Sequence, residues 1–114
     1  QADALGMPCA VASSSGAGWV KGWPGRLGIL ERFACVRTAD DVTRTKPDPA
    51  LFLSAAACLG APPEQCLVLE DSPNGILAAH AAGCPVVAVP GAITGQLALP
   101  AADLLIPSLE ALPL

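Results

Sequence analysis

The segment 66–82 constrains the fold of this chain more than any other part of its sequence. The apolar run at 66–69 leads directly into two acids, Glu70 and Asp71, and Ser72-Pro73 then opens an Ala-rich stretch. An apolar strand that is followed at once by a helix is the repeating unit of a parallel sheet. The two acids are therefore expected at the carboxyl edge of such a sheet, where open α/β sheets bind their ligands.

Short apolar runs alternate with helix-like stretches along the rest of the chain, which predicts an α/β fold with a mostly parallel sheet. Long apolar strands with little alternation also predict that helices cover both faces of this sheet. The expected strands are 9–12, 35–38, 67–69, 85–89 and 104–106, and the expected helices are 50–59 and 73–82, which end at Gly60 and Gly83. Less regular helical stretches are expected at 1–5, from 17 with an interruption at Pro24, at 26–33 and at 108–112, with a polar loop at 40–45.

Composition excludes several classes of protein. The chain has 114 residues, which is enough for one small domain, and 53% of them are apolar, which is unlike a disordered protein. A net charge of −4 with dispersed Lys and Arg lacks the basic patch of a nucleic-acid-binding protein. Residues 72–102 carry no charged side chain, but prolines interrupt them well short of the roughly 20 apolar residues that a membrane span requires. We therefore expect neither nucleic acid nor a membrane as a partner.

The cysteine pattern predicts reduced thiols and a cytoplasmic location. The chain has five cysteines, which are widely spaced and form no C-x-x-C pair. Most of them stand among apolar residues, as buried free cysteines do in proteins of reducing compartments. A zinc site is not expected, because His80 is the single histidine and has no ligand spacing around it.

Two segments offer groups that suit a phosphate. Ser13 and Ser14 follow the first expected strand, where hydroxyls and successive backbone N–H groups favour an anion. Taken alone, such a serine cluster is more often an ordinary helix N-cap. Lys46 can neutralise charge on a transferring phosphoryl group, although most lysines are solvated loop residues. Pro47 and Pro49 favour an extended backbone around Asp48, so that a stiff segment would present Lys46.

The adjacent acids Glu70 and Asp71 suit a metal ion. Two neighbouring carboxylates repel each other and raise one pKa unless a cation lies between them, and Mg²⁺ with its preference for oxygen ligands is the expected cation. The alternative is a pair of solvated turn acids, with Asp71 or Ser72 capping the helix.

The order and spacing of these segments resemble a known family. Val11-Ala12-Ser13-Ser14-Ser15-Gly16, then Arg44-Thr45-Lys46-Pro47-Asp48-Pro49, then Leu69-Glu70-Asp71-Ser72-Pro73-Asn74-Gly75 are similar to the second, third and fourth motifs of the haloacid dehalogenase superfamily. The likeness is greatest to the branch of β-phosphoglucomutase and phosphoglycolate phosphatase, and it covers nearly the whole chain.

The resemblance implies a Rossmann-like core, Mg²⁺ dependence and phosphoryl transfer from a small phosphorylated metabolite through an aspartyl-phosphate. It implies that Ser13 binds the phosphoryl group, with a further contact from Ser14, and that Lys46 stabilises its charge. It also implies that Asp71 binds Mg²⁺ and that Glu70 binds the ion or orients its ligands. Substrate identity, and the choice between phosphatase and phosphomutase, are not implied.

Two parts of the family pattern do not occur in residues 1–114. The Asp-x-Asp motif that carries the nucleophile is absent, and so is the helical cap domain of this branch. In the family, the nucleophile strand lies between the strand that ends at Ser13 and the strand that ends at Glu70. Without it these two strands would each present an unpaired apolar edge that favours self-association, and they would close up, take a strand from a partner, or leave a sheet that is only marginally stable. We therefore expect a partial core, a fragment or truncated frame that is inactive alone.

Two other interpretations compete with an enzyme remnant. The first is a non-catalytic interaction or self-associating module that kept the fold and lost the chemistry. The second is a receiver-like phosphoacceptor domain, which fits less well because Pro90-Gly91 follows the strand expected at 85–89, where a receiver needs a further acid.

Overall fold

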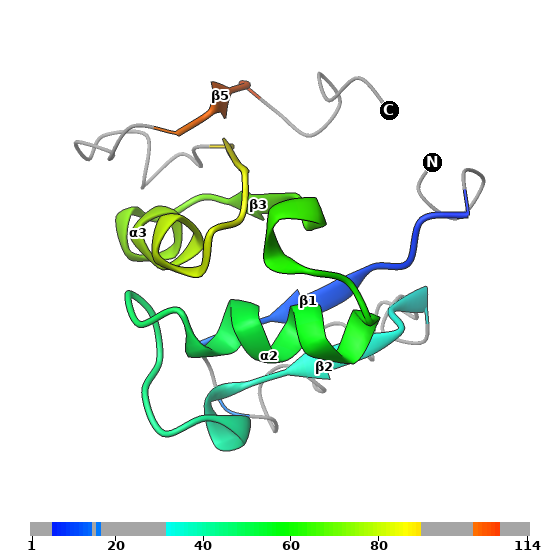
Figure 1. The fold of residues 1–114 in the computed structure, drawn as a ribbon. Coiled ribbons are helices and arrows are strands. Elements are labelled where there is room, and N and C mark those ends of the chain that lie inside the picture. Colours follow the sequence, from blue (N-terminus) through cyan, green and yellow to red (C-terminus); the bar gives the residue numbers. More distant parts are fainter. Residues whose placement is uncertain (1–5, 15, 17–31, 90–101, 108–114) are drawn as a thin grey trace.

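The computed structural model describes residues 6–14, 16, 32–89 and 102–107 as an α/β fold (Figure 1). Its strands are β1 (Ala10–Ala12), β2 (Cys35–Arg37), β3 (Val68–Glu70), β4 (Val86–Ala88) and β5 (Leu104–Leu105). Its helices are α2 (Ala50–Leu59), α3 (Pro73–Ala82) and two 3₁₀ turns, η2 (Ala39–Asp41) and η3 (Pro63–Gln65). The α/β class, the five strands and the two α-helices are as the sequence predicts.

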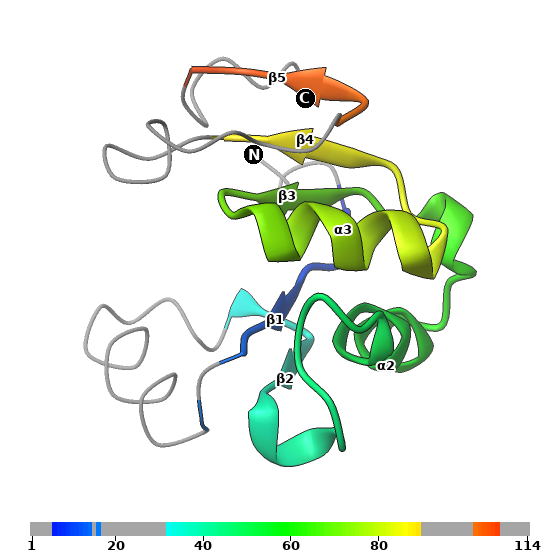
Figure 2. The same cartoon turned by 90° about the vertical axis from the view of Figure 1, so that its left-hand side faces the viewer.

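The described strands form two parallel sheets rather than one continuous sheet. β1 pairs with β2, and β4 lies between β3 and β5. Figure 2 shows β1 on the side of β3 that faces away from β4, so that the spatial order is β5, β4, β3, β1, β2. Of the outcomes predicted for these two strands, closing up is therefore not observed between β1 and β3.

The peptide groups show which edges of β1 and β3 are not paired. The N–H of Ser13 donates to the carbonyl of Arg37 on β2 over 3.0 Å, so the Ala12 carbonyl of the same peptide group points away from β2. The N–H of Val68 donates to Pro85, next to β4, over 2.9 Å, so the Leu67 carbonyl points away from β4. Both strands therefore turn backbone groups toward the space between the sheets.

Both α-helices begin and end with residues that satisfy their terminal backbone groups. The Ser72 hydroxyl accepts the N–H of Gly75 over 3.1 Å, and Pro73 occupies the first turn of α3, where no N–H is needed. Gly60 and Gly83 end α2 and α3 with φ of 72° and 82°, the left-handed conformation that glycine adopts without penalty. These signals explain why both predicted helix ranges match the structure.

The core lies between the helices and the sheets. α2 packs on β1, β2 and α3, while α3 covers β3 and β4. Leu51, Ile76 and Val86 are fully buried. Leu67 and Leu69, by contrast, are 47% and 44% exposed. The prediction that both faces of the sheet are covered is thus wrong for β3, because alternate side chains of this short strand face away from α3.

The segment before α2 differs from its prediction. The N–H of Asp48 donates to the Thr45 carbonyl over 3.0 Å, so residues 45–48 form a tight turn that contains a cis Lys46–Pro47 bond, not an extended stretch. Residues 40–45 are not entirely loop either, since Thr38 and Asp41 form a reciprocal capping box around η2. The helices predicted at 1–5, from 17 and at 108–112, and most of 26–33, lie outside the described residues.

The prediction that all cysteines are reduced is wrong for two of them. Cys35 in β2 and Cys58 in α2 form a disulfide, with a Cα–Cα distance of 6.3 Å. They are 23 residues apart in sequence and meet because α2 packs on β2, a contact that cysteine spacing alone does not reveal. Cys9, Cys66 and Cys84 are free thiols. The disulfide removes the cysteine argument for a cytoplasmic location, which stays a prediction.

No helix within the described ranges is long and apolar enough to cross a membrane.

Candidate functional site

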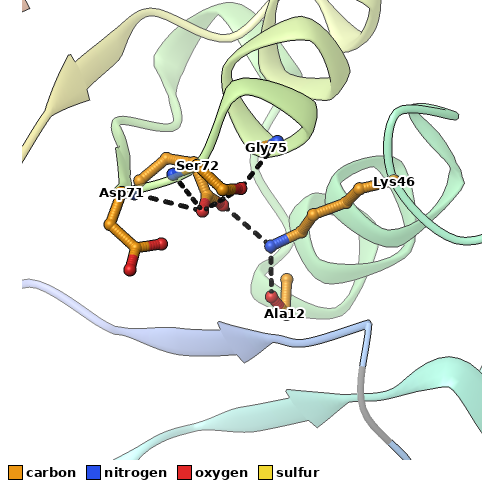
Figure 3. A network of polar contacts seen from close by, with 6 residues as sticks. Ala12, Lys46, Asp71, Ser72 and Gly75 are labelled. Atoms are coloured by element: carbon orange, nitrogen blue, oxygen red, sulfur yellow. Dashed lines mark hydrogen bonds and ion pairs between the residues drawn. The ribbon is translucent and has the colours of Figure 1, made fainter. Parts of the chain in front are cut away.

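Lys46 connects the two sheets at their carboxyl ends (Figure 3). Its Nζ donates to the Ala12 carbonyl at the end of β1 over 2.9 Å and to Glu70 Oε2 at the end of β3 over 2.8 Å. The side chains of Lys46 and Glu70 are only 12% and 9% exposed, so this ion pair is largely shielded from water. The structure thus brings together two residues that are 24 positions apart and were predicted to share a site.

Glu70 uses both of its carboxylate oxygens within the protein. Oε1 accepts the N–H of Asp71 over 3.1 Å, the N–H of Ser72 over 3.3 Å and the Ser72 hydroxyl over 3.1 Å, while Oε2 accepts Lys46. Burial alone would raise the pKa of Glu70, but the hydrogen bond and charge of Lys46, with the contacts from Asp71, outweigh it and lower that pKa. Glu70 is therefore a fixed anion that orients Lys46 and the start of α3.

Asp71 behaves differently from its neighbour. It is exposed, and Figure 3 draws no hydrogen bond between its carboxylate and the Lys46 ammonium. Partial burial and the adjacent Glu70 carboxylate raise the pKa of Asp71. Of the two predicted metal ligands, Asp71 is thus the one that is exposed to solvent. Within the described residues no group of three or more His, Cys, Asp or Glu is placed to hold a metal ion.

The predicted phosphate-binding serines follow β1 directly. Ser13 is half-buried and comes next to Ala12, whose carbonyl binds Lys46. Ser14 is exposed, and Ser15 lies outside the described residues. Ser13 and Lys46 are therefore neighbours at the end of β1, on the same edge as the loop that carries Glu70 and Asp71.

Gly75 is a site residue that the sequence prediction missed. A Cβ at this position would overlap with the Cγ, Cδ and Oε2 atoms of Glu70, so the Glu70 side chain can fold over the first turn of α3 only because residue 75 is glycine. The signal was present in the sequence, since glycine inside a helix costs about 1 kcal/mol relative to alanine and so calls for a packing reason.

Phe52 is a second residue that the prediction missed. The Lys46 Nζ lies 4.8 Å from the centroid of its ring. Phe52 is in the first turn of α2 and is buried. The short turn at 45–48, which the sequence did not predict, is what places Lys46 beside this ring.

A parallel α/β core with a lysine and paired acids at the carboxyl edge defines a Rossmann-like protein with a charged binding edge. Residues 1–89 match the model of the haloacid dehalogenase-like hydrolases, and the chain belongs to this family. This confirms the resemblance given by the three motifs, and it sets aside the receiver-like interpretation.

The comparisons with individual proteins agree with this assignment. The chain is 46% identical over 93 residues to YhcW of Bacillus subtilis (strain 168), covering 82% of this chain and 42% of YhcW. It superposes on CbbY from Rhodobacter sphaeroides, solved in complex with phosphate, with a TM-score of 0.87 and 33% identity over 94% of this chain and 49% of CbbY. It also superposes on β-phosphoglucomutase from Clostridium difficile with a TM-score of 0.79 and 25% identity, covering 94% of this chain and 45% of the mutase. The chain thus spans less than half the length of these relatives.

Proposed function

We propose that this chain forms the phosphate- and magnesium-binding half of an enzyme that removes or transfers the phosphoryl group of a small phosphorylated metabolite. The observation that supports it most is the Lys46 ammonium, which is held between β1 and β3 next to Ser13. Family membership and the likeness to a phosphate-bound relative and to a phosphomutase support the same chemistry. The substrate class is a small phosphate ester, and nothing in the chain selects among such esters.

The roles of the phosphate-binding residues follow from their positions. Ser13 would donate its hydroxyl to a phosphoryl oxygen, and the exposed Ser14 would add a second contact. Lys46 would neutralise the charge that develops on the phosphoryl oxygens during transfer, an effect that is strengthened where water is excluded. The low exposure of the Lys46 side chain favours this role.

Asp71 would contribute a carboxylate oxygen to Mg²⁺, the oxygen donor that this ion prefers. Glu70 would act indirectly, because four donors of the protein already surround its two oxygens. When bound, the ion would offset the negative charge of the phosphoryl group. One exposed carboxylate does not complete a magnesium site, and the remaining ligands would be water, a phosphoryl oxygen of the substrate and the carboxylate of the additional strand proposed below.

The nucleophile also has to come from elsewhere. None of the six aspartates in this chain stands in an Asp-x-Asp motif. We propose that an additional parallel strand enters between β1 and β3 and carries the nucleophilic carboxylate. Its oxygen would form a bond to phosphorus as the ester bond to the leaving oxygen breaks, and water would then release phosphate. The separation of the two sheets supports this proposal.

The test is a phosphate-release assay on two proteins with a panel of small phosphate esters, with and without Mg²⁺. One is the 114-residue chain, and the other is the longest natural form of the protein, established from its complete coding sequence. We expect Mg²⁺-dependent turnover from a form that contains an Asp-x-Asp strand and none from the short chain. Turnover by the short chain would refute the proposed source of the nucleophile.

A non-catalytic module of the same fold is the second candidate. It predicts that the longest natural form also lacks Asp-x-Asp and releases no phosphate. In that case Lys46→Met would alter binding of a partner or of inorganic phosphate without any catalytic effect.

A further inference from the structure

The Lys46 ammonium also lies beside an aromatic ring, to which the proposed mechanism gives no role. The Nζ atom lies 4.8 Å from the centroid of Phe52, well within the roughly 6 Å at which the face of a ring attracts a cation. An ammonium has three N–H donors, and the bonds to the Ala12 carbonyl and to Glu70 employ two of them. The Phe52 ring can therefore interact with the part of the ammonium that does not bind these two oxygens.

Shielding from water makes this contact stronger than a similar pair at an exposed surface. Phe52 is 8% exposed and the Lys46 side chain 12%. A cation–π contact gains when its partners are desolvated, because water no longer competes for the cation. The same burial means that the ammonium depends on its three protein contacts for its location.

The local fold brings the two residues together. The turn at 45–48 reverses the chain, and the Asp48 carboxylate accepts the N–H of Ala50 over 3.0 Å at the start of α2. Phe52 follows in the first turn of this helix and joins the core cluster that contains Val68 and Ile76. Its ring thus has one contact with the core and another with the charged edge.

We propose that Phe52 is a positioning residue. The face of its ring holds the Lys46 ammonium in place between the Ala12 carbonyl and Glu70, in addition to filling the core. The effect of Phe52 on phosphoryl transfer rests on the proposed function, since the held ammonium is the group that would meet the phosphoryl oxygens. The contact between Phe52 and Lys46 does not rest on it, because both residues belong to this chain.

The experiment separates the electronic effect of the ring from its size. Position 52 is replaced by 3,4,5-trifluorophenylalanine, which keeps a similar shape but weakens the attraction of the ring face for a cation, and separately by Tyr and by Leu. The readout is the rate at which an amine-specific reagent labels Lys46, measured by peptide mass spectrometry in the longest natural form of the protein without substrate. Lys21, the other lysine of this chain, is the internal reference.

We expect the trifluoro variant to label at Lys46 roughly two- to thirty-fold faster relative to Lys21, the range that a cation–π contact spans. Phe52→Tyr should label at the original rate, and Phe52→Leu at least as fast as the trifluoro variant. The same fluorinated residue at Phe33, the other phenylalanine, should leave Lys46 labelling unchanged. The melting temperature of each variant shows whether the core is still packed.

Two outcomes would overturn the proposal. If Phe52→Leu labels faster but the trifluoro variant does not, Phe52 acts by packing alone. If no variant changes the labelling of Lys46, the ring does not hold the ammonium. Neither result depends on phosphate release, so failure here is distinct from failure of the proposed function. If the role of Phe52 and the proposed function are both correct, the trifluoro variant should also lose kcat/KM by a similar factor while its melting temperature is unchanged.

Discussion

At the scale of single residues, the site is organised around one buried ion pair. Lys46 and Glu70 are within 2.8 Å, and the contacts of Glu70 with the Asp71–Ser72 loop fix its side chain. Removing one partner of a buried ion pair destabilises the folded protein, because the remaining charge is then neither paired nor solvated. Glu70 would keep its three loop contacts in that case, so the loss should be moderate.

A double-mutant cycle measures this pair. We expect Lys46→Met and Glu70→Gln each to lower the free energy of unfolding by about 1–3 kcal/mol, and the double variant to lose less than the sum. The coupling energy from urea unfolding should lie at about 0.5–3 kcal/mol. Arg32→Met, at an exposed residue before the amino end of β2, is the control and should combine additively with Glu70→Gln. Additive losses for Lys46 and Glu70 would contradict the pairing.

Gly75 provides a second test at this scale. Alanine improves helix propensity by about 1 kcal/mol, but its Cβ would overlap with the Glu70 side chain, and overpacking typically costs about 1–3 kcal/mol. We expect Gly75→Ala to lower the melting temperature and to speed the labelling of Lys46, since Glu70 must move. Asn74→Ala, at the exposed neighbouring position, should change neither quantity. A stabilised Gly75→Ala protein would show that Glu70 does not lie over the helix.

The sequence indicated the charged residues of the site but not the groups that hold them. Ser13, Lys46, Glu70 and Asp71 stand in recognisable motifs, whereas the Ala12 carbonyl and the Phe52 ring belong to residue types that occur in any core. Their contacts with Lys46 depend on the turn at 45–48, and the proline pattern there predicted an extended stretch instead. Contacts that arise from tertiary packing leave no local signal.

At the scale of elements, the helices were predictable and the links between elements were not. Gly60, Ser72 and Gly83 specify helix ends through local backbone conformation and hydrogen bonding, so both ranges could be read directly. The Cys35–Cys58 disulfide joins β2 to α2 across 23 residues, and only the packing of the helix on the strand brings the two together.

Cysteine alkylation under denaturing conditions tests this disulfide. We expect three alkylated cysteines without reductant, Cys9, Cys66 and Cys84, and five after reduction. In the folded protein Cys84 should react most slowly, because burial raises the pKa of its thiol and also restricts access. Five modified cysteines before reduction would contradict the Cys35–Cys58 pair.

Loss of the disulfide should also lower stability. Cys58→Ser is expected to reduce the free energy of unfolding by about 2–4 kcal/mol, since a cross-link of this span restricts the unfolded chain. Cys66→Ser, at a free and partly buried thiol, is the matched control. Equal effects of the two substitutions in urea unfolding would show that the cross-link contributes nothing.

At the scale of the whole molecule, the two sheets account for the expected behaviour of the short chain. β1 and β3 both turn backbone groups toward the space between them, and Leu67 and Leu69 of the β3 segment are exposed. Unpaired strand edges beside apolar side chains promote association. Composition and motifs anticipated this division through the missing family strand, although they did not decide whether the sheets would merge.

We expect the 114-residue chain to associate in a concentration-dependent manner, as measured by light scattering over a tenfold range of concentration. A polypeptide that supplies a matching parallel strand should reduce this association, and a peptide of the same composition in scrambled order should not. A short chain that stays monomeric at every concentration would show that these edges are protected in solution.

The bond between Lys46 and the Ala12 carbonyl has a consequence for how a complete enzyme would assemble. An additional strand along β1 would bring an amide N–H to the same carbonyl, whose oxygen can accept a second hydrogen bond beside the one from Lys46. The ammonium would then be held by the Ala12 carbonyl and Glu70 directly beside the new strand. Addition of that strand would therefore also set the distance between the lysine and the carboxylate that the strand carries.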